Sequence, residues 1–189
     1  MQIPINKSTD IKSIQKHLFL TGAFLFALVL ASKAEIDLGG LVSFTFQTLV
    51  LSVGYYLLPK KWRLFLILSY MALGIAGFRV FNGDTGWAYV ISWPLGFFIG
   101  FVLAAFIPVP MEVTVLALFS YLVQIHVVIL TLGICVVGWH AGSIYKAIDT
   151  LFELLPGLVI KSLLGTGLIW VWNRYYESKI LSYKKGAYK

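Results

Sequence analysis

Few residues of this chain could do chemistry, since 59% are hydrophobic and only 12% are charged. Lys161 is the one charge in the stretch from Leu154 to Asn173, and it follows Pro156-Gly157 by one turn. If a helix begins at Pro156-Gly157, its free N–H groups and positive dipole end lie beside Lys161. This arrangement predicts a binding site for the carboxylate of a ligand. Pairing of Lys161 with Glu153 is the structural alternative.

A second group of candidate residues is expected near the same side of the protein. Thr45 and Gln47 stand at the start of an apolar stretch, and Asn82 stands in a polar one. Their amides and hydroxyl could hydrogen-bond a polar ring, while Phe81 and Trp93 could form the walls around it. A polar-rimmed apolar cleft is the usual small-molecule site. Capping of loops explains the polar residues as an alternative.

Signs of catalysis or metal binding are weak. The sequence has no P-loop, no His-Glu-x-x-His and no run of carboxylates at helical spacing. His140 lies near Ser143, but no visible residue orients the histidine, and His126 is expected to be a neutral side chain bonded within the bundle. The single cysteine, Cys135, excludes an internal disulfide and is expected to be a small buried residue. We therefore predict no catalytic residue, metal or cofactor.

The composition predicts an all-α membrane protein. About a quarter of the residues are charged in an ordinary soluble domain, so these 189 residues could not cover a soluble fold with polar surface. A membrane-spanning helix needs about 20 apolar residues, or somewhat fewer in a bundle. Such stretches predict six transmembrane helices, at residues 17–33, 44–58, 62–78, 90–107, 113–137 and 157–174.

The basic residues orient this bundle. With both termini in the cytoplasm, eleven Lys and Arg residues lie inside, and only Lys33, Arg79 and Lys146 lie outside. Residues 1–16 then form a cytoplasmic segment, 17–175 the membrane domain and 176–189 a basic cytoplasmic tail. The net charge of +7 suits anionic lipid headgroups in a bacterial inner membrane better than nucleic acid. A cleavable secretory signal ending near residue 34 is the alternative for the start of the chain.

Small residues recur at four-residue spacing on two predicted helices. Ala23, Ala27 and Ala31 share one helix face, and so do Gly96 and Gly100. Such faces let helix backbones approach closely in lipid. For the glycines we favour packing within the bundle. For the alanines, contact with a partner protein and internal packing are equally open.

Four ordered stretches of the sequence resemble the BioY family, the biotin-binding S components of energy-coupling-factor (ECF) vitamin transporters. They are Val42-Ser43-Phe44-Thr45-Phe46-Gln47-Thr48, Tyr70 through Gly77 into Val80-Phe81, Gly96-Phe97-Phe98-Ile99-Gly100-Phe101, and Pro156-Gly157 with Lys161. The resemblance covers roughly residues 17–175 and implies six helices with a cytoplasmic N-terminus. It also implies that Ala23, Ala27 and Ala31 contact a transmembrane coupling protein.

The sequence also departs from this family. The acid that usually precedes the lysine, and that would help hold the polar head of biotin, is replaced by Leu158. The usual Pro-Thr-Gly-Gly reads Trp93-Pro94-Leu95-Gly96, and Arg79 replaces a proline. The resemblance therefore implies the fold more strongly than the ligand.

Together these observations predict the substrate-binding subunit of an ECF transporter. It would take up biotin or a related carboxylate-bearing vitamin from the outer side, with Lys161 on the carboxylate and Gln47, Thr45 and Asn82 on the ring. Transport would require an ATPase pair and a coupling membrane protein. The alternatives are a non-transporting scaffold or assembly factor on the same fold and, less favoured, a membrane enzyme using His126 or His140.

Overall fold

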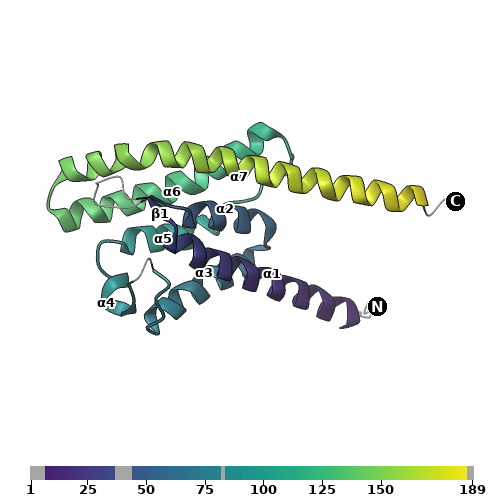
Figure 1. Ribbon diagram of the computed structural model, residues 1–189, viewed down its shortest axis with the longest axis horizontal. Coiled ribbons are helices and arrows are strands. Elements are labelled where there is room, and N and C mark those ends of the chain that lie inside the picture. The colour runs from purple at the N-terminus through teal and green to yellow at the C-terminus, as the bar shows by residue number, and fades with distance from the viewer. Residues whose placement is uncertain (1–6, 37–43, 82–83, 187–189) are drawn as a thin grey trace, which may run out of the picture.

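The computed structural model describes residues 7–36, 44–81 and 84–186 (Figure 1). Its elements are, in chain order, α1 (Lys7–Lys33), β1 (Glu35–Ile36), β2 (Phe44–Thr45), α2 (Gln47–Leu57), α3 (Lys60–Ile75), α4 (Gly86–Val90), α5 (Leu95–Ala104), α6 (Val115–Ala141) and α7 (Ile144–Gly186). The two strands form a short antiparallel pair. Helices therefore make up most of the described part of the chain, and its two strands contain only four residues.

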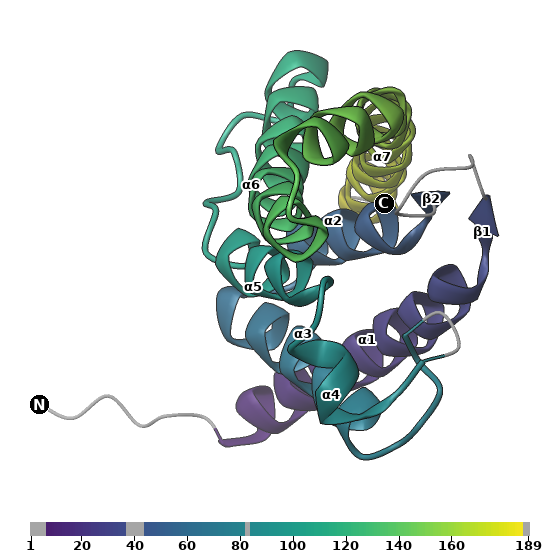
Figure 2. The same cartoon turned by 90° about the vertical axis from the view of Figure 1, so that its left-hand side faces the viewer.

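The helices run along one long axis and divide the molecule into two ends. The β1–β2 pair, α4 and the turn between α6 and α7 lie at one end, which we call the hairpin end (Figure 1). Both chain termini lie toward the other end, here called the termini end. Figure 2 looks along the bundle from the hairpin end and shows α2 lying between α7 and α3. The shared end of the two termini agrees with an even number of passes.

The described helices match the predicted six-helix bundle in number but not in length. Six of them have ten residues or more, namely α1, α2, α3, α5, α6 and α7. Three described segments are long and apolar enough to cross a membrane, and these are Ile11–Lys33, Val115–Ala141 and Ile144–Tyr176. The helices α2, α3 and α5 are shorter, so they span less of the bundle.

The predicted start of the last helix at residue 157 is wrong. Helix α6 ends at Ala141; its C-cap residue, Gly142, has a left-handed φ of 60°, and the Ser143 N–H donates to the Gly138 carbonyl at 3.2 Å. This turn reverses the chain within two residues, so α7 begins at Ile144 and contains Pro156 in its interior. The long outer loop and the helix N-terminus expected beside Lys161 are therefore absent.

Two other predicted boundaries shift for local reasons. The predicted helix 90–107 is shortened to α5, Leu95–Ala104, because α4 ends at Val90, the Ser92 hydroxyl donates to the Tyr89 carbonyl at 2.7 Å in the turn that follows, and Pro94 occupies the N-cap of α5. Helix α1 begins at Lys7, ten residues before the predicted start at 17. Its added turns are polar, and the described side chains from Ile11 to Lys16 are all exposed.

The glycines of α5 pack against α6, as expected. A Cβ atom on Gly100 would stand 2.7 Å from the Cα of Ile129, and one on Gly96 would overlap the carbonyl of Leu132. In return, Gly133 of α6 makes room for the ring of Phe97. The two helices therefore approach each other at a distance that only glycine permits.

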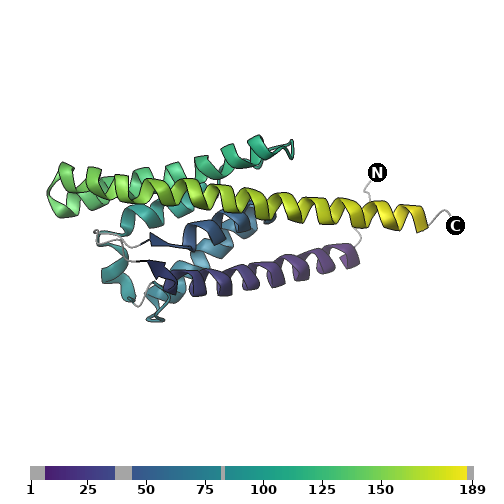
Figure 3. The ribbon, with the colours of Figure 1, turned by 45° about the horizontal axis from the view of Figure 1, so that its top comes forward.

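The alanine stripe of α1 has no such uniform environment. Ala31 is 7% exposed, Ala27 is half-buried and Ala23 is exposed. Figure 3 shows α1 along one edge of the bundle. Its C-terminal end lies beside the β1–β2 pair, and its N-terminal half runs toward the termini end. Internal packing therefore accounts for Ala31 and leaves the rest of the stripe available.

Arg63 joins two helix ends at the termini end of the molecule. Its side chain is 6% exposed, although it is charged. Nε donates to the Leu58 carbonyl at 2.8 Å, after the end of α2, and Nη1 donates to the Ile107 carbonyl at 2.8 Å, after the end of α5. These carbonyls have no partner within their own helices, so the guanidinium caps both helices at once.

Candidate functional site

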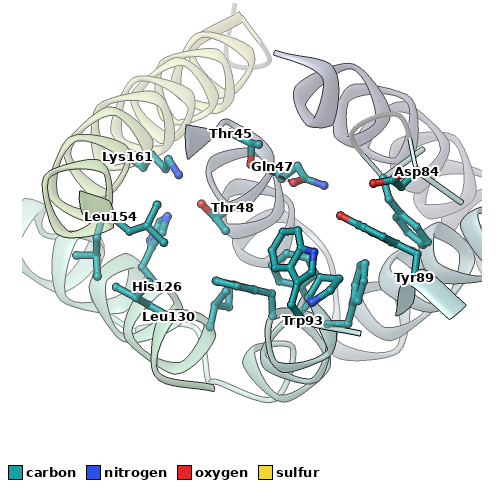
Figure 4. A pocket seen from close by; sticks show the side chains of 17 residues that line it. Thr45, Gln47, Thr48, Asp84, Tyr89, Trp93, His126, Leu130, Leu154 and Lys161 are labelled. Carbon is teal, nitrogen blue, oxygen red and sulfur yellow. Dashed lines mark hydrogen bonds between the residues drawn. The ribbon is translucent and has the colours of Figure 1, made fainter. Parts of the chain in front are cut away.

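A cavity of about 210 Å³ opens at the hairpin end, between α2, α5, α6 and α7. Its lining divides into three chemical groups. Polar residues are Thr45, Gln47, Thr48, Asp84, His126 and Lys161; aromatic residues are Phe81, Tyr89, Trp93, Phe97, Phe98 and Phe101; and the rest are Pro94, Ile129, Leu130, Leu154 and Leu158. In Figure 4, Lys161 and His126 lie on one side and Tyr89 and Trp93 on the other, with Thr45, Gln47 and Thr48 between them.

The aromatic wall is preorganised by contacts among its own rings. Phe81 is 2% exposed, and its ring fills the space beside Gly74 of α3. The Phe81 ring centroid lies 5.8 Å from that of Tyr89 in a stacked arrangement, and Tyr89 meets Trp93 edge to face at 6.0 Å. Such pairs stabilise one another beyond the area that they bury. The wall is a rigid apolar surface for a flat or saturated ring.

Gln47 is held by a chain of hydrogen bonds that fixes its orientation. The Tyr70 hydroxyl donates to the Val80 carbonyl at 2.7 Å and therefore accepts from Gln47 Nε2 at 2.6 Å. The opposite end of the amide, Oε1, accepts from the Thr45 hydroxyl at 3.0 Å. Because Tyr70 uses its only proton on Val80, the nitrogen of Gln47 must face Tyr70. A second N–H of the amide remains for a ligand.

Lys161 brings the positive charge of the cavity. It lies on α7, five residues after Pro156, and its side chain is 8% exposed. Since α7 is continuous from Ile144, the N-terminus of its own helix does not lie beside Lys161. The predicted support of Lys161 by a helix dipole is thus wrong. A buried ammonium with a neighbouring cavity is nonetheless a strong sign of function in a membrane protein.

Most predicted site residues meet at this cavity. Lys161, Gln47, Thr45, Phe81 and Trp93 all line it, although they come from separate parts of the chain. The sixth predicted residue, Asn82, lies outside the described residues. Their convergence is a structural fact, whereas their contact with a ligand stays a prediction.

The set of six predicted ligand-binding residues does not include Thr48, the neighbour of Gln47, or His126, yet both line the cavity. The expected internal bond of His126 is present, because Nδ1 lies 2.8 Å from the Leu122 carbonyl. Its Nε2 atom and the Thr48 hydroxyl are buried without a hydrogen-bond partner. A polar residue halfway along an apolar helix was the signal that could have placed His126 in the site.

The described residues do not suggest a metal centre. Among them, no group of three or more His, Cys, Asp and Glu side chains is arranged to hold an ion. Cavity chemistry here rests on hydrogen bonding, one ammonium group and aromatic surface. These are features of a binding site for an organic molecule.

Comparisons with known proteins agree with this arrangement. The model of the BioY family matches residues 6–178. The biotin transporter BioY of Thermotoga maritima is 30% identical over 142 residues, which cover 72% of this chain and 83% of that protein. The crystal structure of an S-component for biotin from an ECF-type ABC transporter matches with a TM-score of 0.68 and 15% identity, over 90% of this chain and 95% of the other.

These matches cover nearly the whole described bundle, including all the elements that form the cavity. The structural match supports the six-helix fold, with its three long apolar helices, in a multi-pass membrane protein. The family model, which matches residues 6–178, and the 30% identical relative both identify the family of this sequence. The chain belongs to the BioY family.

Proposed function

We propose that this chain is the substrate-binding S component of an ECF-type transporter, and that its substrate is biotin. The observation that carries the proposal is the cavity at the hairpin end, because residues predicted to bind a vitamin converge on it. A scaffold would not need a buried ammonium and unpartnered polar atoms in an open cavity. Family membership also assigns the chain to transport proteins and leaves no reason to treat it as an enzyme.

The cavity offers groups that match the chemistry of biotin. Biotin joins a saturated bicycle, which carries a cyclic urea, to a chain that ends in a carboxylate. The aromatic wall around Phe81 and Trp93 would pack against the bicycle. Gln47, Thr45 and Lys161 would hydrogen-bond the polar groups, and we keep Asn82 as a further candidate. Lys161 would donate to an oxygen of the ligand.

Two features support the proposed partners: the sequence carries no ATP-hydrolysing motif, and α1 has a partly exposed face of small residues. The sequence carries no P-loop, so energy would come from an ATPase pair coupled through a second membrane protein. Ala23 is exposed and Ala27 is half-buried on α1, so this face could contact a helix of that coupling protein, with Ala31 at the end of the same face. We place the assembly in a bacterial inner membrane.

Charge asymmetry supports an orientation for this assembly. The basic segments 1–16 and 176–189 would lie in the cytoplasm and flank the membrane domain 17–175. The hairpin end, with its cavity, would then face outward. Substrate would be captured there and released inward only with the partner proteins.

Calorimetry with biotin on the detergent-purified chain tests the function. We expect the wild type to bind, and Lys161→Ala to weaken binding about 30-fold or more, because truncating one partner of a desolvated charged contact costs about 2–5 kcal/mol. Lys161→Arg should restore only part of the affinity. Lys146→Ala, which changes an exposed lysine on the same helix, is the matched control and should bind as the wild type does. Absence of binding by the wild type would refute the proposal.

Cysteine labelling tests the orientation. Because Cys135 is exposed, the background is first made cysteine-free with Cys135→Ser. A cysteine at Gly142, in the turn at the hairpin end, should then react with a membrane-impermeant maleimide in intact cells. A cysteine at Ser182 should react only after the membrane is opened. Labelling of Ser182→Cys in intact cells would overturn the orientation.

A further inference from the structure

The carbonyl of Val80 joins the end of α1 to the wall of the cavity. Val80 is 6% exposed and directly precedes Phe81, which belongs to the aromatic wall. Its oxygen accepts from the Tyr70 hydroxyl of α3 at 2.7 Å and from the Ser32 hydroxyl of α1 at 2.7 Å. Two side chains from separate helices therefore occupy both acceptor positions of one buried carbonyl.

Ser32 and Tyr70 are buried hydroxyls outside the cavity. Both side chains are 0% exposed, and neither belongs to the lining. The single proton of Ser32 is shared, because its oxygen also lies 2.7 Å from the Val29 carbonyl of its own helix. Tyr70 is therefore the donor whose proton goes to Val80 alone. The Tyr70 oxygen then has only acceptor capacity left, and it accepts from Gln47 Nε2 at 2.6 Å.

These bonds form one chain from α1 to the cavity. It runs from Ser32 to the Val80 carbonyl, then to the Tyr70 hydroxyl, and ends at the amide of Gln47. Of these four residues only Gln47 lines the cavity (Figure 4). A side chain that is fixed before its ligand arrives loses little freedom on binding, so this chain favours affinity without touching the ligand.

We infer that Ser32 and Tyr70 are positioning residues, and that the last turn of α1 helps to set the affinity of a cavity that none of its described residues lines. The inference rests on the proposed function, because it needs Gln47 to contact biotin. Ser32 holds the Val80 carbonyl, and that carbonyl takes the Tyr70 proton. The Tyr70 oxygen then fixes one orientation of the Gln47 amide.

The first pair of variants removes a tyrosine hydroxyl. Tyr70→Phe keeps the ring, whose centroid lies 5.3 Å from that of Phe81. The matched control is Tyr55→Phe. The Tyr55 side chain is also 0% exposed, and its hydroxyl donates to the carbonyl of Phe101, another lining residue, at 2.7 Å. Both variants thus take a buried hydroxyl away from a carbonyl, and only Tyr70→Phe releases the amide of Gln47.

The second pair of variants removes a serine hydroxyl. Ser52 of α2 is 0% exposed, as Ser32 is, and its hydroxyl donates to the Leu49 carbonyl three residues earlier at 2.9 Å. Ser32 makes the same kind of local bond to Val29, and it also reaches Val80 in another segment. Ser32→Ala and Ser52→Ala therefore both lose a local bond, but only Ser32→Ala loses the link to the cavity.

Calorimetry with biotin on the detergent-purified variants tests the inference. We expect Tyr70→Phe to weaken binding about tenfold and Ser32→Ala about threefold, because the ligand must then order the amide itself. Tyr55→Phe and Ser52→Ala should bind as the wild type does. Thermal unfolding should show similar losses of stability within each pair, so that a difference in affinity reports positioning rather than damage to the fold.

Two double variants test whether the residues act through one chain. Adding Ser32→Ala to Tyr70→Phe should weaken binding little beyond Tyr70→Phe alone, and adding Tyr70→Phe to Gln47→Ala should weaken it little beyond Gln47→Ala alone. Fully additive losses would show that the residues support the fold independently, and would overturn the inference.

The outcomes separate this inference from the proposed function. If the wild type binds biotin and both Tyr70→Phe and Ser32→Ala bind it as their controls do, only the inference falls. If the wild type does not bind biotin, the proposed function fails, and the inference falls with it.

Discussion

Two helices of this protein carry small residues at the same four-residue spacing, and the structure uses them differently. On α5, Gly96 and Gly100 lie in direct contact with the backbone of α6. On α1, Ala31 is buried while Ala23 is exposed. The comparison teaches that this spacing predicts a close approach but does not identify the surface that approaches. The small-residue face of α5 is covered by another helix of the same chain, whereas part of the small-residue face of α1 is exposed.

The largest effect is expected at the covered face. Gly100→Leu would force a side chain against Ile129, whose Cα stands 2.7 Å from the position of a Cβ atom. The two helices must separate, so we expect a loss of about 3 kcal/mol or more in unfolding free energy. Thermal unfolding of the detergent-purified protein measures it. Ile99→Leu, at the exposed neighbouring position, should unfold like the wild type. A Gly100→Leu protein of wild-type stability would show that the contact is loose.

A smaller and more selective effect is expected at the open face. Ala27→Trp would block close approach of another helix to α1, so association with the proposed coupling protein and uptake should be lost. Biotin binding should stay within about twofold, since Ala27 does not line the cavity. Co-purification and calorimetry measure the two properties. Leu163→Trp on the exposed face of α7 is the control. Survival of both uptake and co-purification would make the stripe an ordinary packing surface.

The smallest effects should appear along the alanine stripe itself. Ala31→Leu adds volume at a position that is 7% exposed, and should cost about 1–2 kcal/mol of unfolding free energy. Ala23→Leu, at an exposed position, should change it by less than about 0.5 kcal/mol. Thermal unfolding of the two variants side by side measures the gradient. Equal stabilities would mean that the two halves of the stripe are packed alike.

The fold class was predictable because lipid imposes length and composition on helices. The apolar stretches predicted six helices, and the described chain contains six of ten residues or more. The start of α7 was not predictable in this way. Lys146 and Asp149 interrupt the apolar pattern, but both side chains are exposed and cost the helix little. Pro156 lacks an N–H, and the helix continues through it, as membrane helices can.

The candidate site was predictable in its residues more than in its geometry. Lys161 and Gln47 were identified because polar groups in apolar stretches are expensive unless they have a use. His126 met the same criterion, but a hydrogen bond within the bundle was a sufficient explanation for it; the structure shows that bond, to the Leu122 carbonyl, and also places His126 in the lining of the cavity. Only the three-dimensional arrangement shows that a histidine bonded within the bundle also lines a cavity.

The exposure of Cys135 shows a further limit of sequence reasoning. The prediction that it is buried is wrong, because the side chain is exposed on α6. In a soluble protein, an apolar neighbourhood in sequence indicates the interior. A bundle in lipid has an exterior as apolar as its core, so the pattern that separates the two faces of a soluble helix is lost.

Arg63 acts at two stages, during membrane insertion of the chain and in the folded bundle. Charges that orient a membrane protein act on the chain while it is being inserted, before the bundle has packed. In the proposed orientation Arg63 is one of the eleven inward basic residues at that stage. In the finished bundle the same guanidinium is 6% exposed and bonded to the Leu58 and Ile107 carbonyls. The same side chain thus helps to orient the chain during insertion and later stabilises the packed bundle. Its replacement by an apolar residue would therefore affect two separate stages of biogenesis, insertion and folding.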